Sequence, residues 1–332
     1  MQHRMITRQR RWADARTQHV EGGAVRNTAN HRKTARWAAL AGAMAMAGAA
    51  LVVVQLAGTA PASAVAGVHR AVGSSLTNSL SPKTARAFCD PGEQVLGGGG
   101  RVQAVGAFTP RLTLTQLQPV AAGGTTQARY QVTAAETTPG TTSNWFVQAY
   151  AICAPANSVS GYHIVTSPPT NPSSQSVQTA AAVCPGGERV IGTGGRILQA
   201  SGTGQVVLQV ARASATGDIT RVQAHEQADG FPSPWRVLAY AVCVNPPAGY
   251  QIVTGLSAER LSESVKFATV DCPPGKRVHS VGAAITNTAP GNVSLQVVEP
   301  SADLKQMRAI AVENTPTSQN WDFIVVRGIC AF

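Results

Sequence analysis

The chain has 332 residues, of which 44% are hydrophobic and 13% are charged, and its formal net charge is +11. So few charged residues exclude a long charged disordered tail, and a single apolar stretch excludes a protein with many membrane-spanning helices. The charge is uneven, because residues 1–64 hold nine of the 27 basic residues but only two of the 16 acidic ones. After residue 64 the basic residues are scattered, so we expect no binding of nucleic acid.

Residues 1–64 have the organisation of a signal peptide with a long basic leader. A basic segment precedes the apolar residues 37–54, and small residues then lead to Ala64. We expect cleavage after Ala64, or alternatively after Ala62, and secretion of the rest of the chain. An uncleaved N-terminal anchor that leaves the rest of the chain outside the cell is the alternative, since about 18 apolar residues can cross a bilayer. Translation from Val25 would give a leader of conventional length.

One pattern then occurs three times. It opens with C-x-x-G-x-x-V-x-x-x-G and closes with a segment that runs from a tryptophan to a second cysteine. A glycine-led segment before each opening divides the chain into repeats at residues 65–160, 161–248 and 249–332. Each repeat has the size of a small β-domain and exceeds the usual solenoid unit.

Alternating apolar and polar residues predict β-strands throughout the repeats. The alternation is clearest at residues 112–115, 206–210, 219–225, 293–297 and 307–313. The closing segments predict a further strand in each repeat, with the tryptophan on the core side. We therefore predict an all-β fold of three tandem β-sandwich or β-prism-like repeats, with five or six strands each. Whether the repeats pack around a pseudo-threefold axis or in a row stays open.

The glycine-rich openings have two interpretations. A phosphate-binding loop would need G-x-x-x-x-G-K-[ST] or G-x-G-x-x-G before a helix, and neither is present. A strand that bends sharply uses glycine for a bulge or for close approach of another backbone. The third repeat favours the strand, because it keeps Gly282 but has Ala283 where the others have a second glycine.

All six cysteines follow the leader, two in each repeat at equivalent positions, which indicates disulfides. Pairing within repeats makes the three units alike, whereas pairing between successive repeats must also join the first cysteine to the last. We favour the first scheme and expect no metal site, because no C-x-x-C or Cys/His cluster is present. The favoured pairs are Cys89–Cys153, Cys184–Cys243 and Cys272–Cys330.

No motif of a hydrolase, metalloenzyme or deaminase occurs, and we expect neither catalysis nor a cofactor. The histidines do not form one site, because His69 and His163 are equivalent but the third copy is Gln251. An enzyme site built between repeats from Glu136, Glu226 or Glu313 and nearby arginines is the least favoured alternative.

Two recurring sets of residues are candidates for ligand binding. The first is Glu136, Glu226 and Glu313, which either bind a cation or a sugar hydroxyl or, as we favour, accept backbone N–H bonds at strand ends. As ligands, they would form three equivalent sites or one site on a pseudo-threefold axis. The second is Tyr150, Tyr240, Tyr162 and Tyr250, which we expect to form an exposed aromatic patch. The repeated tryptophans could bind sugars, but we expect them in the core.

The paired C-P-x-G-x-x-V-x-G-x-G-G opening and A-Y-A-[IV]-C closing resembles a module of secreted bacterial proteins. That resemblance covers all three repeats and implies secretion and disulfides without implying a ligand. The Cys-Pro-x-Gly opening is also similar to that of the vitelline membrane outer layer protein family, whose β-prism implies a pseudo-threefold assembly. We expect a secreted, non-catalytic binding protein for glycan or cell-envelope material. The alternative is a coat-like or inhibitor-like protein without a small ligand.

Overall fold

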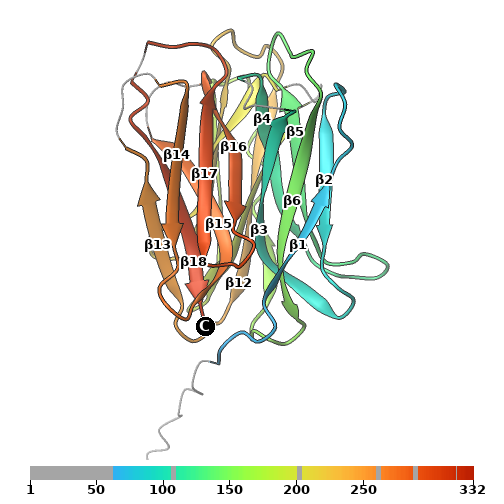
Figure 1. The fold of residues 1–332 in the computed structure, drawn as a ribbon, viewed down its shortest axis with the longest axis vertical. Coiled ribbons are helices and arrows are strands. Elements are labelled where there is room, and N and C mark those ends of the chain that lie inside the picture. Colours follow the sequence, from blue (N-terminus) through green and yellow to red (C-terminus); the bar gives the residue numbers. More distant parts are fainter. Residues whose placement is uncertain (1–62, 106–109, 200–203, 259–262, 287–290, 319) are drawn as a thin grey trace, which may run out of the picture. The chain divides into compact units, whose positions relative to one another are not determined.

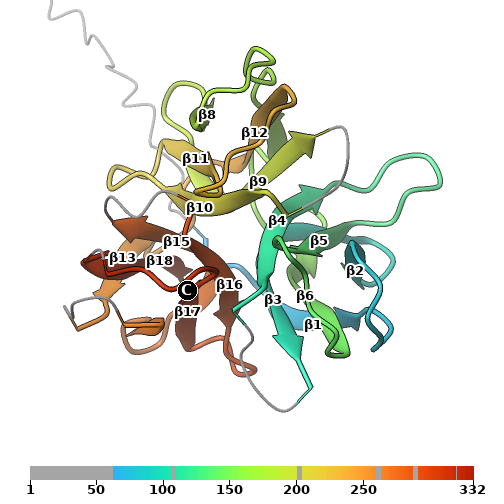
Figure 2. The ribbon, with the colours of Figure 1, turned by 90° about the horizontal axis from the view of Figure 1, so that it is seen from above.

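The computed structural model describes residues 63–105, 110–199, 204–258, 263–286, 291–318 and 320–332, so the predicted signal segment lies outside it. Gly58–Phe332 form one compact unit. Its described part contains 18 strands in three six-stranded sheets, which confirms the all-β prediction. No helix that could cross a membrane occurs among the described residues. The strands run along the long axis of the unit (Figure 1), and the sheets surround a central pseudo-threefold axis (Figure 2).

Each repeat contributes six strands in the same order. Repeat 1 holds β1 (His69–Ser74), β2 (Lys83–Phe88), β3 (Glu93–Ala104), β4 (Leu112–Val120), β5 (Arg129–Glu136) and β6 (Trp145–Pro155). Repeat 2 holds β7 (His163–Thr166), β8 (Val177–Val183), β9 (Arg189–Gln199), β10 (Val206–Ala213), β11 (Ile219–Glu226) and β12 (Trp235–Val244). Repeat 3 holds β13 (Gln251–Leu256), β14 (Val265–Asp271), β15 (Arg277–Thr286), β16 (Val293–Pro300), β17 (Gln306–Glu313) and β18 (Phe323–Ala331).

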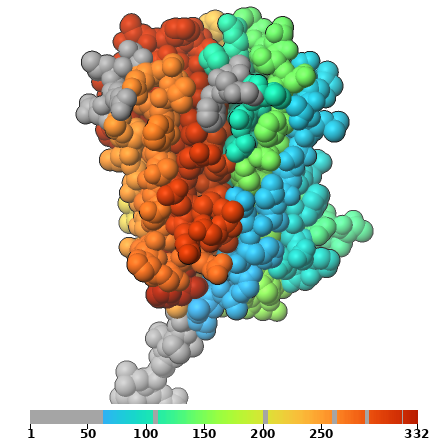
Figure 3. Space-filling model, in the orientation of Figure 1, coloured from blue at the N-terminus to red at the C-terminus, as the bar shows by residue number. Residues whose placement is uncertain are grey.

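Every sheet is shared by two repeats. Sheet I has the order β1-β6-β3-β16-β17-β14, sheet II the order β2-β5-β4-β9-β12-β7, and sheet III the order β13-β18-β15-β10-β11-β8. Strands from repeats 1 and 3 therefore form one continuous face, which is blue and green on one side and orange and red on the other in Figure 3. No repeat contains a complete sheet, so the three repeats form a single cyclic unit.

The glycine-rich openings are bulged strands, as the sequence predicted, and the structure brings the three strands together at the axis. Their register shifts with respect to the closing strand at the same point in each repeat. A Cβ at Gly97 would lie 2.3 Å from the His279 carbonyl oxygen, and one at Gly192 would lie 2.0 Å from that of Leu96. In repeat 3, Ser280 takes the glycine position, and its Oγ accepts a hydrogen bond of 3.1 Å from the Thr193 N–H. These contacts hold strands β3, β9 and β15 against one another.

The core of each repeat lies between two sheets that a disulfide joins. All three disulfides lie within repeats, with sequence separations of 64, 59 and 58 residues. In repeat 1, Cys89 follows β2 of sheet II and Cys153 lies on β6 of sheet I. In the chain-entropy model each such loop stabilises the fold by about 4 kcal/mol. The repeated tryptophans, Trp145, Trp235 and Trp321, are at most 1% exposed and belong to the core, as predicted.

One histidine is buried at the axis. His279 occupies the position of Leu96 and Ile191 in the other openings and is fully buried. Its Nδ1–H donates to the Arg277 carbonyl at 2.9 Å, and its Nε2 has no partner among the described residues. Burial lowers the pKa of His279 to about 4, and the bond to Arg277 opposes this shift.

We expect His279→Leu to make folding less sensitive to acid. The unfolded histidine has a pKa near 6.5, so its stabilising contribution is complete above that pH and is lost as the pH falls towards 4. Between pH 7 and pH 5 the wild-type protein should lose about 2 kcal/mol more unfolding free energy than the variant. Urea unfolding at both pH values measures this, and an equal loss in the two proteins would contradict it.

Alanine substitutions test the packing at the axis. Gly192→Ala should destabilise the protein strongly, by about 3 kcal/mol or more, because the new methyl group meets the backbone of another repeat. Gly186→Ala is the matched control, since nothing lies within 4 Å of a Cβ there. Thermal unfolding of both variants measures the difference, and similar melting temperatures would show that the axis tolerates displacement.

Candidate functional site

The three repeated glutamates are bonded to the three core tryptophans. The Trp145 Nε1–H donates to Glu136 Oε1 at 2.8 Å, and Trp235 makes the same bond to Glu226 at 2.8 Å. In repeat 3 the distance between Trp321 Nε1 and Glu313 Oε1 is 3.2 Å. The second oxygen of Glu136 accepts the Thr141 N–H at 3.1 Å, which is the predicted loop bond. These carboxylates form three separate structural contacts rather than one site on the axis.

A buried cation lies beside this pair in two repeats. Lys83 Nζ lies 4.4 Å from the Trp145 ring centroid, and Lys266 Nζ lies 4.4 Å from that of Trp321. Burial lowers the pKa of Lys83, and the charge of Glu136 opposes that shift. In repeat 2 the equivalent residue is Gln178, which donates to the Trp235 carbonyl at 2.7 Å.

Two of the tyrosines connect repeats and do not form an exposed aromatic patch. The Tyr162 hydroxyl donates to the Val95 carbonyl at 3.0 Å, and the Tyr250 hydroxyl donates to the Val190 carbonyl at 2.8 Å. Both acceptors lie at the bulge of the preceding repeat, so each ring joins its repeat to the one before it. Burial raises the pKa of both hydroxyls above the ordinary tyrosine range. The expectation of exposed rings fails here, because both rings are half-buried and their hydroxyls bond the preceding repeat.

The other two tyrosines lie on the outer sides of sheets I and II. Tyr150 and Tyr240 are only 5% exposed, and the Arg70 guanidinium lies over the Tyr150 ring. The Tyr150 hydroxyl donates to Gln148 Oε1 at 3.0 Å. These two rings do not form the exposed patch either, although each lies at the centre of a polar surface.

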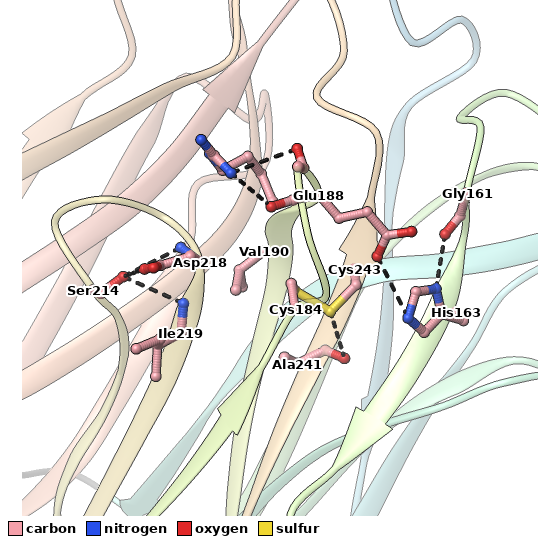
Figure 4. The surroundings of a disulfide bond; sticks show 12 residues. Gly161, His163, Cys184, Glu188, Val190, Ser214, Asp218, Ile219, Ala241 and Cys243 are labelled. Carbon is pink, nitrogen blue, oxygen red and sulfur yellow. Dashed lines mark hydrogen bonds and ion pairs between the residues drawn. A yellow bond between two sulfur atoms is a disulfide. The ribbon is translucent and has the colours of Figure 1, made fainter.

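A histidine–glutamate pair lies beside the disulfide in two repeats. His163 Nε2 is 3.5 Å from Glu188 Oε2, and Figure 4 shows this pair next to the disulfide of repeat 2. His69 and Glu93 form the same pair at 3.4 Å in repeat 1. The neighbouring sulfurs are in disulfides and provide no thiolate, so each cluster has two metal ligands where a structural zinc site uses four.

Repeat 3 replaces this pair with another bonded pair. There Gln251 stands for the histidine and Lys276 for the glutamate, and Lys276 Nζ donates to Gln251 Oε1 at 2.7 Å. The two positions remain in contact in all three repeats although the residue types differ. A structural role therefore explains them.

The outer face of each sheet has an equivalent line of residues across its middle, which we call the central row. In each row a glycine of β3, β9 or β15 lies beside the strand that enters from the other repeat. The register of the paired strands defines the rows. They are Thr269, Arg308, Glu299, Gly99, Tyr150 and Val72 in sheet I; Arg86, Gln131, Gln118, Gly194, Tyr240 and Thr166 in sheet II; and Ala181, Arg221, Arg212, Gly282, Arg327 and Thr254 in sheet III.

The central row of sheet I has a carboxylate at its centre, paired with arginines. Glu299 accepts hydrogen bonds from Nε of Arg308 at 3.1 Å and from its Nη2, and lies 3.9 Å from Arg101 Nη1. The Arg70 guanidinium lies 5.0 Å from the Tyr150 ring centroid. A cavity of about 350 Å³ lies over these residues. Burial raises the pKa of Tyr150 to about 12, and Glu299 adds to that shift.

The central row of sheet II is mostly uncharged and rich in amides. Gln131 Oε1 accepts the Arg86 Nε–H at 2.9 Å, and the Gln116 side-chain amide donates to Gln118. The Thr133 hydroxyl donates to Gln116 Oε1 at 3.0 Å. A cavity of about 210 Å³ lies beside this network. This face offers neutral hydrogen-bonding groups at the edge of an aromatic ring.

The central row of sheet III is basic. Arg212 and Arg221 are direct cross-strand partners, and Arg327 lies on the next strand but one from Arg212. Sequence reasoning missed all three rows, because they form only when strands from two repeats join. The one sign of the rows in the sequence is a position five residues before each repeated glutamate, which is Gln131 in repeat 1 but Arg221 and Arg308 in repeats 2 and 3.

A scan of family models gives no match to this chain, and no curated protein matches it significantly.

Removing the indole N–H should show that the glutamates stabilise the fold. Trp235→Phe leaves a buried oxygen of Glu226 without its donor, and we expect a loss of about 2 kcal/mol. Glu226→Gln is the control, because its amide oxygen still accepts the bond, and its loss should be smaller. Urea unfolding measures both, and unchanged stability of Trp235→Phe would favour a ligand-binding role for the glutamate.

Proposed function

We propose that the protein is a secreted, non-catalytic binding protein, and that the outer face of sheet II binds a neutral glycan of cell-envelope material. One observation carries the proposal: the repeats keep the same buried scaffold but differ in the central rows. Disulfides, tryptophan–glutamate pairs and bulges all recur. The central rows differ in charge, and stability alone does not require that difference.

Secretion is the setting in which the rest of the chemistry makes sense. Three disulfides persist in oxidising compartments, and the N-terminal segment has the sequence of an export signal. The described part contains no free cysteine. A stable, disulfide-joined scaffold suits a protein that meets its ligand outside the cell.

Neutral amides and hydroxyls make sheet II the best match to a sugar. Sugar hydroxyls donate and accept hydrogen bonds, and so do Gln131, Gln118 and Thr133. Of these three residues Thr133 lines the neighbouring cavity, together with Gln116, Arg196 and Pro82. Ile197 and Leu198 also line this cavity, so apolar and hydrogen-bonding groups converge, as in small-ligand sites.

Co-sedimentation of the full-length protein with insoluble cell wall, chitin and cellulose tests this proposal. We expect saturable pelleting that a soluble sugar competes away. Gln131→Ala should weaken binding about 5-fold, the effect of one neutral hydrogen bond. Gln306→Ala is the control, since it removes an amide bonded to Asp271 on sheet I.

Two results would contradict the proposal. Pelleting no greater than that of denatured protein would exclude these glycans as ligands. Saturable pelleting that Gln131→Ala and Gln306→Ala leave equally strong would place the glycan on another face.

A further inference from the structure

Two arginines lie directly opposite each other on sheet III. Arg212 of β10 pairs with Arg221 of β11 in the sheet register. Like charges in such positions destabilise a sheet. A third guanidinium lies at the same place, because Arg327 Nη1 donates to the Ala213 carbonyl, the residue after Arg212, at 3.1 Å. The Arg327 Nε–H also donates to Thr254 Oγ1 at 3.2 Å, which fixes the side chain across the row.

Sheet I shows how the same positions are arranged when the charge is balanced. Glu299 stands there in the position of Arg212, and Arg308 in that of Arg221. The carbonyl equivalent to Ala213 O is Pro300 O, which accepts a bond of 2.9 Å from Arg70. Both sheets thus bring a guanidinium to the same backbone oxygen. Only sheet I has a carboxylate at the centre.

No described carboxylate replaces it on sheet III. Neither Arg212, Arg221 nor Arg327 has an ion pair within 4.0 Å in the described part of the chain. Arg212 and Arg327 are half-buried, so water screens their charges incompletely. Burial lowers the pKa of Arg212, and the neighbouring Arg327 and Arg221 lower it further. The cluster therefore concentrates positive charge with no described carboxylate to offset it.

We propose that the central row of sheet III binds a tetrahedral oxyanion, a phosphate or sulfate group, between Arg212, Arg221 and Arg327. Guanidinium groups bind such oxyanions through paired N–H donors with charge-assisted hydrogen bonds. The bound group would take the role that the Glu299 carboxylate has on sheet I. This site goes beyond the neutral glycan proposed for sheet II and does not depend on it.

The experiment titrates full-length protein with inorganic phosphate, sulfate and chloride at constant ionic strength, using calorimetry and thermal unfolding. We expect saturable binding of phosphate or sulfate and a concentration-dependent rise in Tm that chloride does not give. The phosphate and sulfate titrations distinguish the two groups by affinity.

The repeats themselves supply the test variant. Arg212→Glu copies sheet I, so it should fold and should lose at least 10-fold in oxyanion affinity. Arg212→Gln copies Gln118 of sheet II, and it serves as the second variant if the first does not fold. Arg236→Glu is the control, because it makes the same charge change at an exposed position of sheet II and should bind like the wild-type protein.

Three outcomes would overturn the proposal. One is a Tm that responds equally to all three salts. Another is an equal loss of affinity in Arg212→Glu and Arg236→Glu, which would indicate net charge alone. The third is phosphate binding that does not saturate. Any of these leaves the glycan proposal for sheet II unaffected, since its test uses different residues and a neutral ligand.

Discussion

Three bulged strands meet at the axis in close backbone contacts, and the rest of the structure depends on these contacts. Gly97 and Gly192 lie so near the backbone of another repeat that a methyl group would overlap a carbonyl oxygen. Dense interiors relax only partly, so these contacts fix the separation of β3, β9 and β15. Each sheet is completed by one strand pair between two repeats: β16 with β3, β4 with β9, and β10 with β15. These pairs lie just outward of the axis, and each has only two registered residue pairs. Without the contacts at the axis, little else would align these short strand pairs.

Sharing of sheets explains why the links between repeats take the form they do. Each disulfide ties together two sheets, and each of those sheets continues into a different neighbouring repeat. Tyr162 and Tyr250 lie at the start of repeats 2 and 3, and each donates a hydrogen bond to the bulge of the preceding repeat. These bonds connect the segments between repeats to the axis. The ring closes where the Val65 N–H donates to the Phe332 carbonyl at 2.7 Å. Repeats 1 and 3 lie side by side in this cyclic fold because sheet I takes strands from both of them.

Features that recur within each repeat could be predicted, because three copies of a local pattern reveal it. Strand alternation, the core tryptophans, the disulfide pairing and the bulges were all predicted on that basis. The sharing of each sheet by two repeats could not be predicted. Three strands from one repeat show the same alternation whichever repeat supplies the other three strands of their sheet. Lys83 was missed because lysine is rarely buried unless paired, and its partners, the Asn78 and Trp145 carbonyls and the Trp145 ring, come together only in the fold.

Comparison among the repeats separates structural positions from functional ones. Where a histidine–glutamate pair becomes Gln251 and Lys276, both members change and a hydrogen bond remains. Where a buried lysine becomes Gln178, the new side chain still donates to a carbonyl beside the tryptophan. At these places the substitutions preserve the contact, and stability is a sufficient reason for them.

The central row of sheet III breaks this rule. Replacing the equivalent of Glu299 with Arg212 removes an acceptor and adds a charge beside two of the same sign, and no other residue in the described chain compensates. The arginine at this position lowers stability, whereas Glu299 and Gln118 fill the equivalent positions of sheets I and II without a like charge opposite. The stability of the fold therefore does not explain the arginine. An external anion supplies an explanation, because it would give the arginines of sheet III the negative partner that Glu299 gives those of sheet I.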